Sequence, residues 1–151
     1  MLTRRFLLSA APVAALAAPA AAQQAGMPPR YGSVTLAPGF MPDPFVKRVQ
    51  AGGSINLAQR FQACPGHVDQ RPDVNLIWSG GSRLFISVRS QVDTTLLVNG
   101  ADGRWYCDDD TNGHNPRVVF NPGQRGQYNI WVGCFEQQLA WVELRISEMP
   151  S

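Results

Sequence analysis

Short apolar runs separated by turn residues follow one another from Tyr31 to the C-terminal end of the chain. Alternation of apolar and polar positions with a period of two predicts strands that bury one face. Three segments show it most clearly, with the apolar sets Leu84, Ile86, Val88, then Tyr128, Ile130, Val132, and finally Val142, Leu144, Ile146. No long window after position 22 has the 3.6-residue period of an amphipathic helix.

Shorter strands are predicted where β-branched and aromatic residues are enriched between turns. Their ranges are 46–49, 54–58, 74–78, 94–98, 104–107 and 117–120. The first two flank Gly52-Gly53, which predicts a hairpin. Eight or nine short strands, with 14 glycines and 12 prolines for the turns, predict an all-β fold. We expect an antiparallel, jelly-roll-like β-sandwich over residues 31–150, preceded by a flexible leader at 23–30.

The first 22 residues have the three parts of a secretory signal peptide. Arg4-Arg5 is followed by an apolar middle and by Ala20 and Ala22, so cleavage is expected before Gln23. A membrane anchor is the alternative, but two prolines interrupt the run and alanine is only weakly apolar. The arginine pair is similar to a twin-arginine signal with one residue of the usual spacing missing. We therefore expect a periplasmic or secreted protein, exported by the general or the twin-arginine route.

Charge narrows the classes of partner. Removal of the signal takes away two arginines and no acid, which leaves eleven basic and eleven acidic residues over 23–151. A chain without net charge has no long-range attraction for DNA, RNA or anionic lipid. We expect no nucleic-acid partner and no membrane insertion once the signal is cleaved.

The cysteines are three, an odd number for an exported chain in which a disulfide is the default expectation. Three pairings are possible. Cys64–Cys107 is favoured because both residues lie at loop or strand-end positions. Cys134 follows Gly133 at the end of a well-patterned strand, and it is either a buried small apolar residue or a free thiol.

An acidic turn is the sharpest local motif. Asp108, Asp110 and Asn112, followed by a glycine, match the first half of a calcium loop, in which alternate oxygen side chains converge on the ion. The later glutamate of such loops is missing, so Asp93 or Asp102 would have to complete the site. The alternative is a solvated turn whose side chains hydrogen-bond to their own backbone.

Aromatic residues give a second candidate site. A hairpin of segments 126–132 and 139–147 would place Trp131 opposite Trp141 on an outer sheet face, where the rings would stack on a sugar or on another protein. Trp105 and Tyr106 would extend that surface. The alternative is that the tryptophans are buried, as is common for this residue.

The second half of the chain resembles the bacterial pre-peptidase C-terminal domain and related small exported proteins. The segments that carry the resemblance are Asp93–Asn99, Asp102–Asp110, Asn115-Pro116 and Gly126–Gly133, in that order. Together they give an Asp-Thr-x-Leu strand, an Asp-Gly turn, a Cys-Asp-Asp stretch and a Gly-x-Tyr-x-Ile-x-Val strand. The match spans about residues 64–148.

This resemblance implies a jelly-roll-like sandwich in an exported protein, of the kind usually appended to secreted hydrolases. It also implies that the cysteine before the acidic run pairs with one in a Cys-x-Gly stretch such as Cys64-Pro65-Gly66. Cys134 departs from the pattern, which has a hydroxyl residue there. We expect this domain to stand without a peptidase, and a peptidase activity would then belong to the usual neighbours of the domain.

Catalytic motifs are not found in the sequence. A hydrolase site around His67, Asp69 and Asp93 lacks an indicated nucleophile. We therefore expect a non-catalytic module that binds a protein or a glycan, ordered by calcium at the acidic turn. The alternatives are a hydrolase with an unrecognised site and a purely structural envelope protein.

Overall fold

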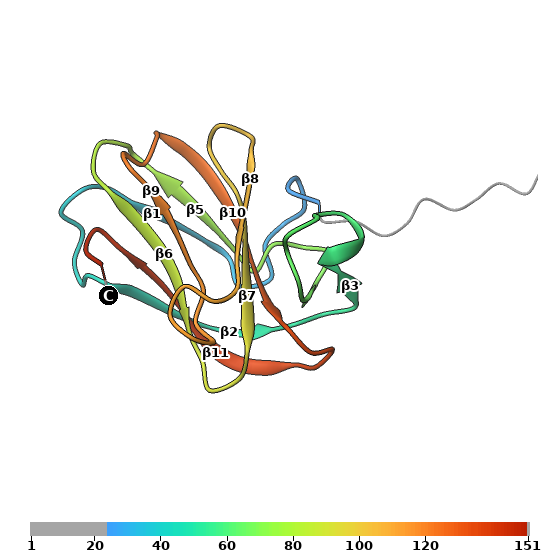
Figure 1. The fold of residues 1–151 in the computed structure, drawn as a ribbon. Helices are drawn as coiled ribbons and strands as arrows, with labels where there is room; N and C mark the ends of the chain where they lie inside the picture. Colours follow the sequence, from blue (N-terminus) through green and yellow to red (C-terminus); the bar gives the residue numbers. More distant parts are fainter. Residues whose placement is uncertain (1–23, 151) are drawn as a thin grey trace, which may run out of the picture.

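Residues 24–150 are described by the computed structural model, and they form two packed β-sheets (Figure 1). This confirms the predicted all-β sandwich. The strands are β1 (Ser33–Leu36), β2 (Phe45–Ala51), β3 (Ile55–Asn56), β4 (His67–Val68), β5 (Val74–Trp78), β6 (Leu84–Arg89), β7 (Thr94–Asn99), β8 (Trp105–Asp108), β9 (Arg117–Phe120), β10 (Gly126–Cys134) and β11 (Ala140–Ser147). A 3-10 turn, η1 (Leu57–Gln59), follows β3. None of the helices in this part of the chain is long and apolar enough to cross a membrane.

The larger sheet is organised around the nine-residue strand β10. On one side β10 pairs with β5 and then with β4, and on the other it pairs with β7. The sheet continues outward from β5 to β1, from β4 to β3 and from β7 to β8. The β1–β5 pair is parallel, unlike the fully antiparallel sheet that we predicted, and β1 and β4 were not predicted at all.

The smaller sheet has the order β2-β11-β6-β9. Two predicted hairpins are wrong for the same reason, because each chain segment crosses from one sheet to the other at the turn. After β2 the chain passes Gly52-Gly53 and enters β3 of the larger sheet. Gly52 has φ 99°, and a Cβ there would collide with the backbone carbonyl of Gln138. Likewise, β10 and β11 are consecutive but belong to different sheets.

The main core lies between the two sheets. The alternating residues predicted from the sequence point into it: Tyr128, Ile130 and Val132 from β10 face Val142, Leu144 and Ile146 from β11. Cys134, a free cysteine, is buried in the same core, and burial raises the pKa of its thiol. It therefore fits the buried apolar role that we considered for it.

A second, smaller core covers the other face of the larger sheet. The segment from β3 to Cys64 folds over β7 and β10 and buries Ile55 and Leu57 against Leu97 and Trp131, with Val68 of β4 in the same cluster. The Cys64–Cys107 disulfide ties this segment to β8, with a Cα–Cα distance of 5.8 Å. The favoured pairing is thus confirmed, and a disulfide is typical of oxidising compartments.

The N-terminal part enters the sandwich along the segment before β5. Of the predicted leader, residues 24–30 are described; Gln24 N donates to Gln70 O (3.0 Å) and Arg30 N donates to Pro72 O (2.8 Å). The predicted signal peptide, residues 1–22, lies outside the described residues.

Candidate functional site

The outer face of the smaller sheet carries the candidate binding site. On β11, Trp141, Glu143 and Arg145 alternate with the core residues and therefore point away from the core. The strand register sets Arg48 of β2 and Arg89 of β6 on either side of Glu143. One exposed aromatic ring and several arginines thus share a single face.

Trp141 is the exposed aromatic of this face, with 55% of its surface accessible. The Arg48 guanidinium lies over its ring, 5.2 Å from the centroid. The Tyr31 ring meets it edge-on at a centroid distance of 6.2 Å. These cation–π and edge contacts hold the indole in one orientation while much of it stays in solvent.

Two adjoining hollows mark the surface beside this ring. A groove of about 850 Å³ is lined by Trp141, Arg48 and polar side chains that include Gln91 and Asn115. A cleft of about 340 Å³ lies next to it, and both Arg89 and Asn115 line the two hollows. Together they form a trough with an aromatic end, large enough for a small ligand.

The prediction that Trp131 joins Trp141 on an outer face is wrong. Trp131 is 0% exposed in the second core, and its Nε1 donates to Gln70 O at 3.4 Å. The two tryptophans belong to different sheets because β10 and β11 do not form a hairpin. Trp131 faces away from the main core, as its alternation with Val132 requires, but the segment after β3 covers it.

Trp105 and Tyr106 do not extend the Trp141 surface either. Trp105 lies between Phe61 and Trp131, with centroid distances of 5.4 Å to each. Tyr106, the next residue of β8, packs against Phe120 and donates to Asp102 Oδ2. Both belong to the larger sheet, and both are half-buried.

The acidic turn brings together three consecutive carboxylates. Oxygens of Asp108, Asp109 and Asp110 lie within 4.8 Å of one another, a set that can hold a metal ion. Asp108 Oδ2 accepts hydrogen bonds from Thr111 N (3.2 Å) and Arg117 N (2.8 Å). Burial raises the pKa of Asp109, and the nearby carboxylates raise it further. A cation bound at the turn would relieve the repulsion among these carboxylates.

Two of the four predicted calcium ligands, Asp108 and Asp110, are in this cluster, while the other two lie outside it. Asn112 pairs with Asn115 through backbone hydrogen bonds of 3.0 and 3.2 Å. Asp93 Oδ2 lies 3.6 Å from His114 Nδ1. It remains close enough to contribute to the raised pKa of Asp109.

In fold, the chain is similar to a pre-peptidase C-terminal domain. That domain belongs to a collagenase of Bacillus anthracis; identity is 12%, the TM-score is 0.49, and the match covers 80% of this chain and 98% of that one. A second similar structure is PliG of Aeromonas hydrophila, a periplasmic inhibitor of g-type lysozyme, with 9% identity, a TM-score of 0.42 and coverage of 77% and 96%. No family model and no curated protein sequence matches the chain.

The residues of the hydrolase alternative are occupied by separate local contacts. His67 Nδ1 lies 3.3 Å from Phe135 O, and Asp69 Oδ1 accepts a hydrogen bond from Arg71 N. Asp93 is paired with His114. Among residues 24–150, the acidic turn is the one group of three or more His, Cys, Asp or Glu side chains whose ligand atoms converge.

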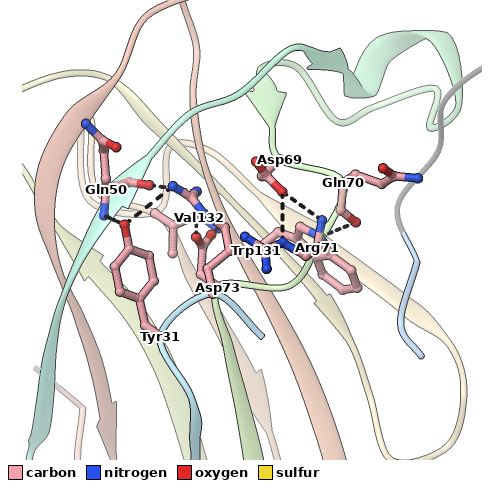
Figure 2. Close-up of polar contacts among 9 residues, drawn as sticks. Tyr31, Gln50, Asp69, Gln70, Arg71, Asp73, Trp131 and Val132 are labelled. Atoms are coloured by element: carbon pink, nitrogen blue, oxygen red, sulfur yellow. Dashed lines mark hydrogen bonds and ion pairs between the residues drawn. The ribbon is translucent and has the colours of Figure 1, made fainter. Parts of the chain in front are cut away.

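A buried ion pair was missed by the sequence reasoning. Asp73 is 0% exposed; its Oδ1 lies 3.1 Å from Arg30 Nη1 and its Oδ2 accepts from Val132 N at 2.7 Å (Figure 2). Arg30 also donates to Gln50 O, 3.2 Å away. Burial raises the pKa of Asp73 to about 7. The network joins β10 of one sheet to β2 of the other, so we interpret it as a structural clamp.

Proposed function

We propose that this chain is an exported, non-catalytic module that binds a glycan through Trp141. The observation that carries the proposal is the half-exposed, oriented indole beside an open groove. An exposed aromatic ring of this size provides a flat apolar surface, and a sugar ring stacks on it through its C–H face. The polar side chains along the groove supply partners for sugar hydroxyls.

The direct test is carbohydrate binding by the mature chain and by Trp141→Ala. Binding is first located on an array of bacterial and plant polysaccharides and then measured by titration calorimetry with the best oligosaccharide. We expect Trp141→Ala to weaken binding about five- to 150-fold, the loss that stacking energies of roughly 1–3 kcal/mol on an aromatic ring predict. Phe135→Ala is the matched control, because Phe135 is also exposed (42%) but does not line the groove.

Silence on the array would contradict the glycan proposal. So would a glycan that binds Trp141→Ala as tightly as it binds the unchanged protein. A protein captured only by chains that retain Trp141, with no carbohydrate bound, would replace the glycan with a protein partner on the same face.

We also propose that calcium orders the acidic turn. Two of the carboxylates are half-buried and Asp110 is exposed, so a cation can reach the cluster from solvent. Hard oxygen ligands suit Ca²⁺, which accepts six to eight oxygens, and water would fill the remaining positions. Asp93 is the nearest further carboxylate suggested by the charge effects on Asp109.

Calcium titration of the metal-free protein tests this second proposal. We expect heat of binding and a higher melting temperature with Ca²⁺, because an ion that binds only the folded state stabilises it. Asp110→Asn is expected to abolish both effects, whereas Glu136→Gln, an exposed acid outside the cluster, is expected to keep them. The absence of heat together with an unchanged melting temperature would discard the calcium site.

Export through a cleaved signal is the third part of the proposal. Its support is the disulfide of the folded domain together with the signal pattern of residues 1–22. N-terminal sequencing of the protein from the periplasm or medium is expected to begin at Gln23. Replacement of Arg4-Arg5 by lysines blocks export if the twin-arginine route is used and leaves it intact if the general route is used. Recovery of the uncleaved chain in the cytosol would contradict export.

A further inference from the structure

We propose that the cleft beside the Trp141 groove binds a carboxylate of the ligand, so that the module selects acidic glycans. This inference rests on the proposed function and adds the chemical class of the sugar. The cleft, of about 340 Å³, is lined by Arg89, Arg117 and Arg145, together with Ser87, Asn112 and Asn115. Its lining includes no aspartate or glutamate.

The strand register explains why three arginines converge here. Ser87 of β6 has Arg145 of β11 as its neighbour on one side and Arg117 of β9 on the other. Arg89 lies two residues along β6 on the same face, because side chains alternate along a strand. Ser87 separates Arg145 from Arg117 across the sheet, and Arg89 lies opposite Glu143, so the three guanidinium groups reach the same cleft from three strands.

Positive side chains outnumber acidic ones on the outward face of the smaller sheet. The outward positions of the four strands carry four arginines, which are Arg48, Arg89, Arg117 and Arg145, and one acid, Glu143. Glu143 Oε2 lies 3.7 Å from Arg145 Nη1 and is about half-exposed, so this pair is weak. Arg145 Nε is buried and makes no hydrogen bond within the described chain. The chain from 23 to 151 is neutral as a whole, so this positive face is local.

Guanidinium groups select the kind of anion. The planar fork of arginine matches the two oxygens of a carboxylate, and such charge-assisted hydrogen bonds are about twice as strong as neutral ones. Side-chain amides of Asn112 and Asn115 can donate to the same anion or to neighbouring hydroxyls. A carboxylate therefore meets donors on several sides of the cleft.

Continuity with the aromatic groove favours a sugar over a peptide. Arg89 and Asn115 line both hollows, so one extended ligand can reach the cleft while it stacks on Trp141. Between these ends the groove offers the polar side chains of Ser90 and Gln91. A uronic-acid oligomer presents the matching series of a ring face, hydroxyls and a carboxylate. The flat ring of Trp141 favours a sugar, although the groove is also lined by the apolar Val46, Val92 and Val142.

The test compares two ligands with the same sugar rings, one with free carboxylates and one with uncharged methyl esters. Trigalacturonate and its fully methyl-esterified form share the same sugar rings, and both are titrated into the mature protein in calcium-free buffer. We expect the acid to bind at least about tenfold more tightly than the ester, the factor that one charge-assisted hydrogen bond provides. We further expect added salt to weaken binding of the acid and to leave binding of the ester nearly unchanged.

Variants locate the effect in the cleft. Arg89→Gln, at an exposed position, is expected to fold normally and to remove most of the preference for the acid; Arg145→Gln is expected to do the same. Arg125→Gln, an exposed arginine outside the two hollows, is the matched control and is expected to keep the preference. Melting temperatures of all variants show that a lost preference does not come from unfolding.

Failure of this inference and failure of the proposed function give different results. Equal affinity for acid and ester, both lost in Trp141→Ala, would overturn the carboxylate site and keep the glycan module. A preference for the acid that survives Arg89→Gln and Arg145→Gln would also overturn it. Hexaglutamate bound more tightly than trigalacturonate, again through Arg89, would replace the acidic glycan by an acidic peptide. If neither sugar binds, the inference for uronic acids is wrong. The polysaccharide array then tests separately whether the module binds any glycan.

Discussion

Arg30 Nη1 lies 3.1 Å from Asp73 Oδ1, and this pair links the two sheets of the sandwich. The other carboxylate oxygen of Asp73 accepts from Val132 N on the central strand of the larger sheet, and Arg30 also donates to Gln50 O on the edge strand of the smaller one (Figure 2). The carboxyl group is buried, while the guanidinium is 16% exposed. The free energy of unfolding is therefore expected to depend on whether the Asp73 carboxyl group is protonated.

Stability is expected to fall as pH rises from about 4 to about 7. Burial raises the pKa of Asp73 from 3.8 to about 7 in the folded chain, so folding takes up a proton between these values. The contribution of this group is fully present below pH 3.8 and is lost as pH rises through 7. Urea unfolding of the unchanged protein and of Asp73→Asn across this range is the measurement. Parallel curves for the two proteins would contradict the raised pKa.

Arg30→Ala is expected to lower the free energy of unfolding by about 3–5 kcal/mol at pH 8, because it leaves the Asp73 carboxylate buried and without its cation. At pH 5 the carboxyl group is protonated and the cost is expected to be smaller. Arg125→Ala, at an exposed position, is the control and is expected to change stability by less than about 0.5 kcal/mol. An equal loss at both pH values would indicate that packing, and not charge, sets the effect.

Loss of the disulfide is expected to cost about 4 kcal/mol. The bond closes a loop with a sequence separation of 43, and the chain-entropy relation gives this value for the Cys64→Ser, Cys107→Ser double variant. Chemical unfolding with and without reductant is the measurement, and reduction is expected to leave the double variant unaffected. If reductant does not change the unfolding midpoint of the unchanged protein, the disulfide does not hold the second core in place.

The two tryptophans that we expected together are predicted to behave in opposite ways. Trp131→Ala removes a fully buried side chain and is expected to lower the free energy of unfolding by about 3–5 kcal/mol. Trp141→Ala is expected to cost less than about 1 kcal/mol, because Trp141 is half-exposed. Thermal unfolding measures both. Similar losses for the two variants would mean that Trp141 is not available to a ligand.

Much of the strand pattern was predictable from the sequence, because alternation along β6, β10 and β11 records burial between two layers. The Cys64–Cys107 pair was predictable because both cysteines were expected at loop or strand-end positions, and the structure places Cys64 in the loop before β4 and Cys107 near the end of β8. The sheet to which each strand belongs was not predictable, because crossing at Gly52 or after β10 leaves the alternation of the flanking strands unchanged.

The residues of the binding face could not be predicted without knowing which sheet each strand joins. Trp141 was identified from the sequence as an outward residue, but its partner Trp131 lies under a segment whose position follows from long-range contacts. The arginine cleft was missed altogether. Arg89, Arg117 and Arg145 come from three separated strands, and only the register of the smaller sheet brings them around Ser87. Asp73 was missed because a single acid before a strand resembles an ordinary turn residue.

The most direct measurement is an NMR titration of the isotope-labelled mature protein with trigalacturonate, followed through the indole N–H signals of its four tryptophans. We predict that the Trp141 signal shifts until the ligand saturates the site, while the signals of Trp78 and Trp131, which lie in the two cores, stay in place. Shifts confined to Trp105, or no shift of Trp141 at saturating ligand, would contradict the assignment of the binding face.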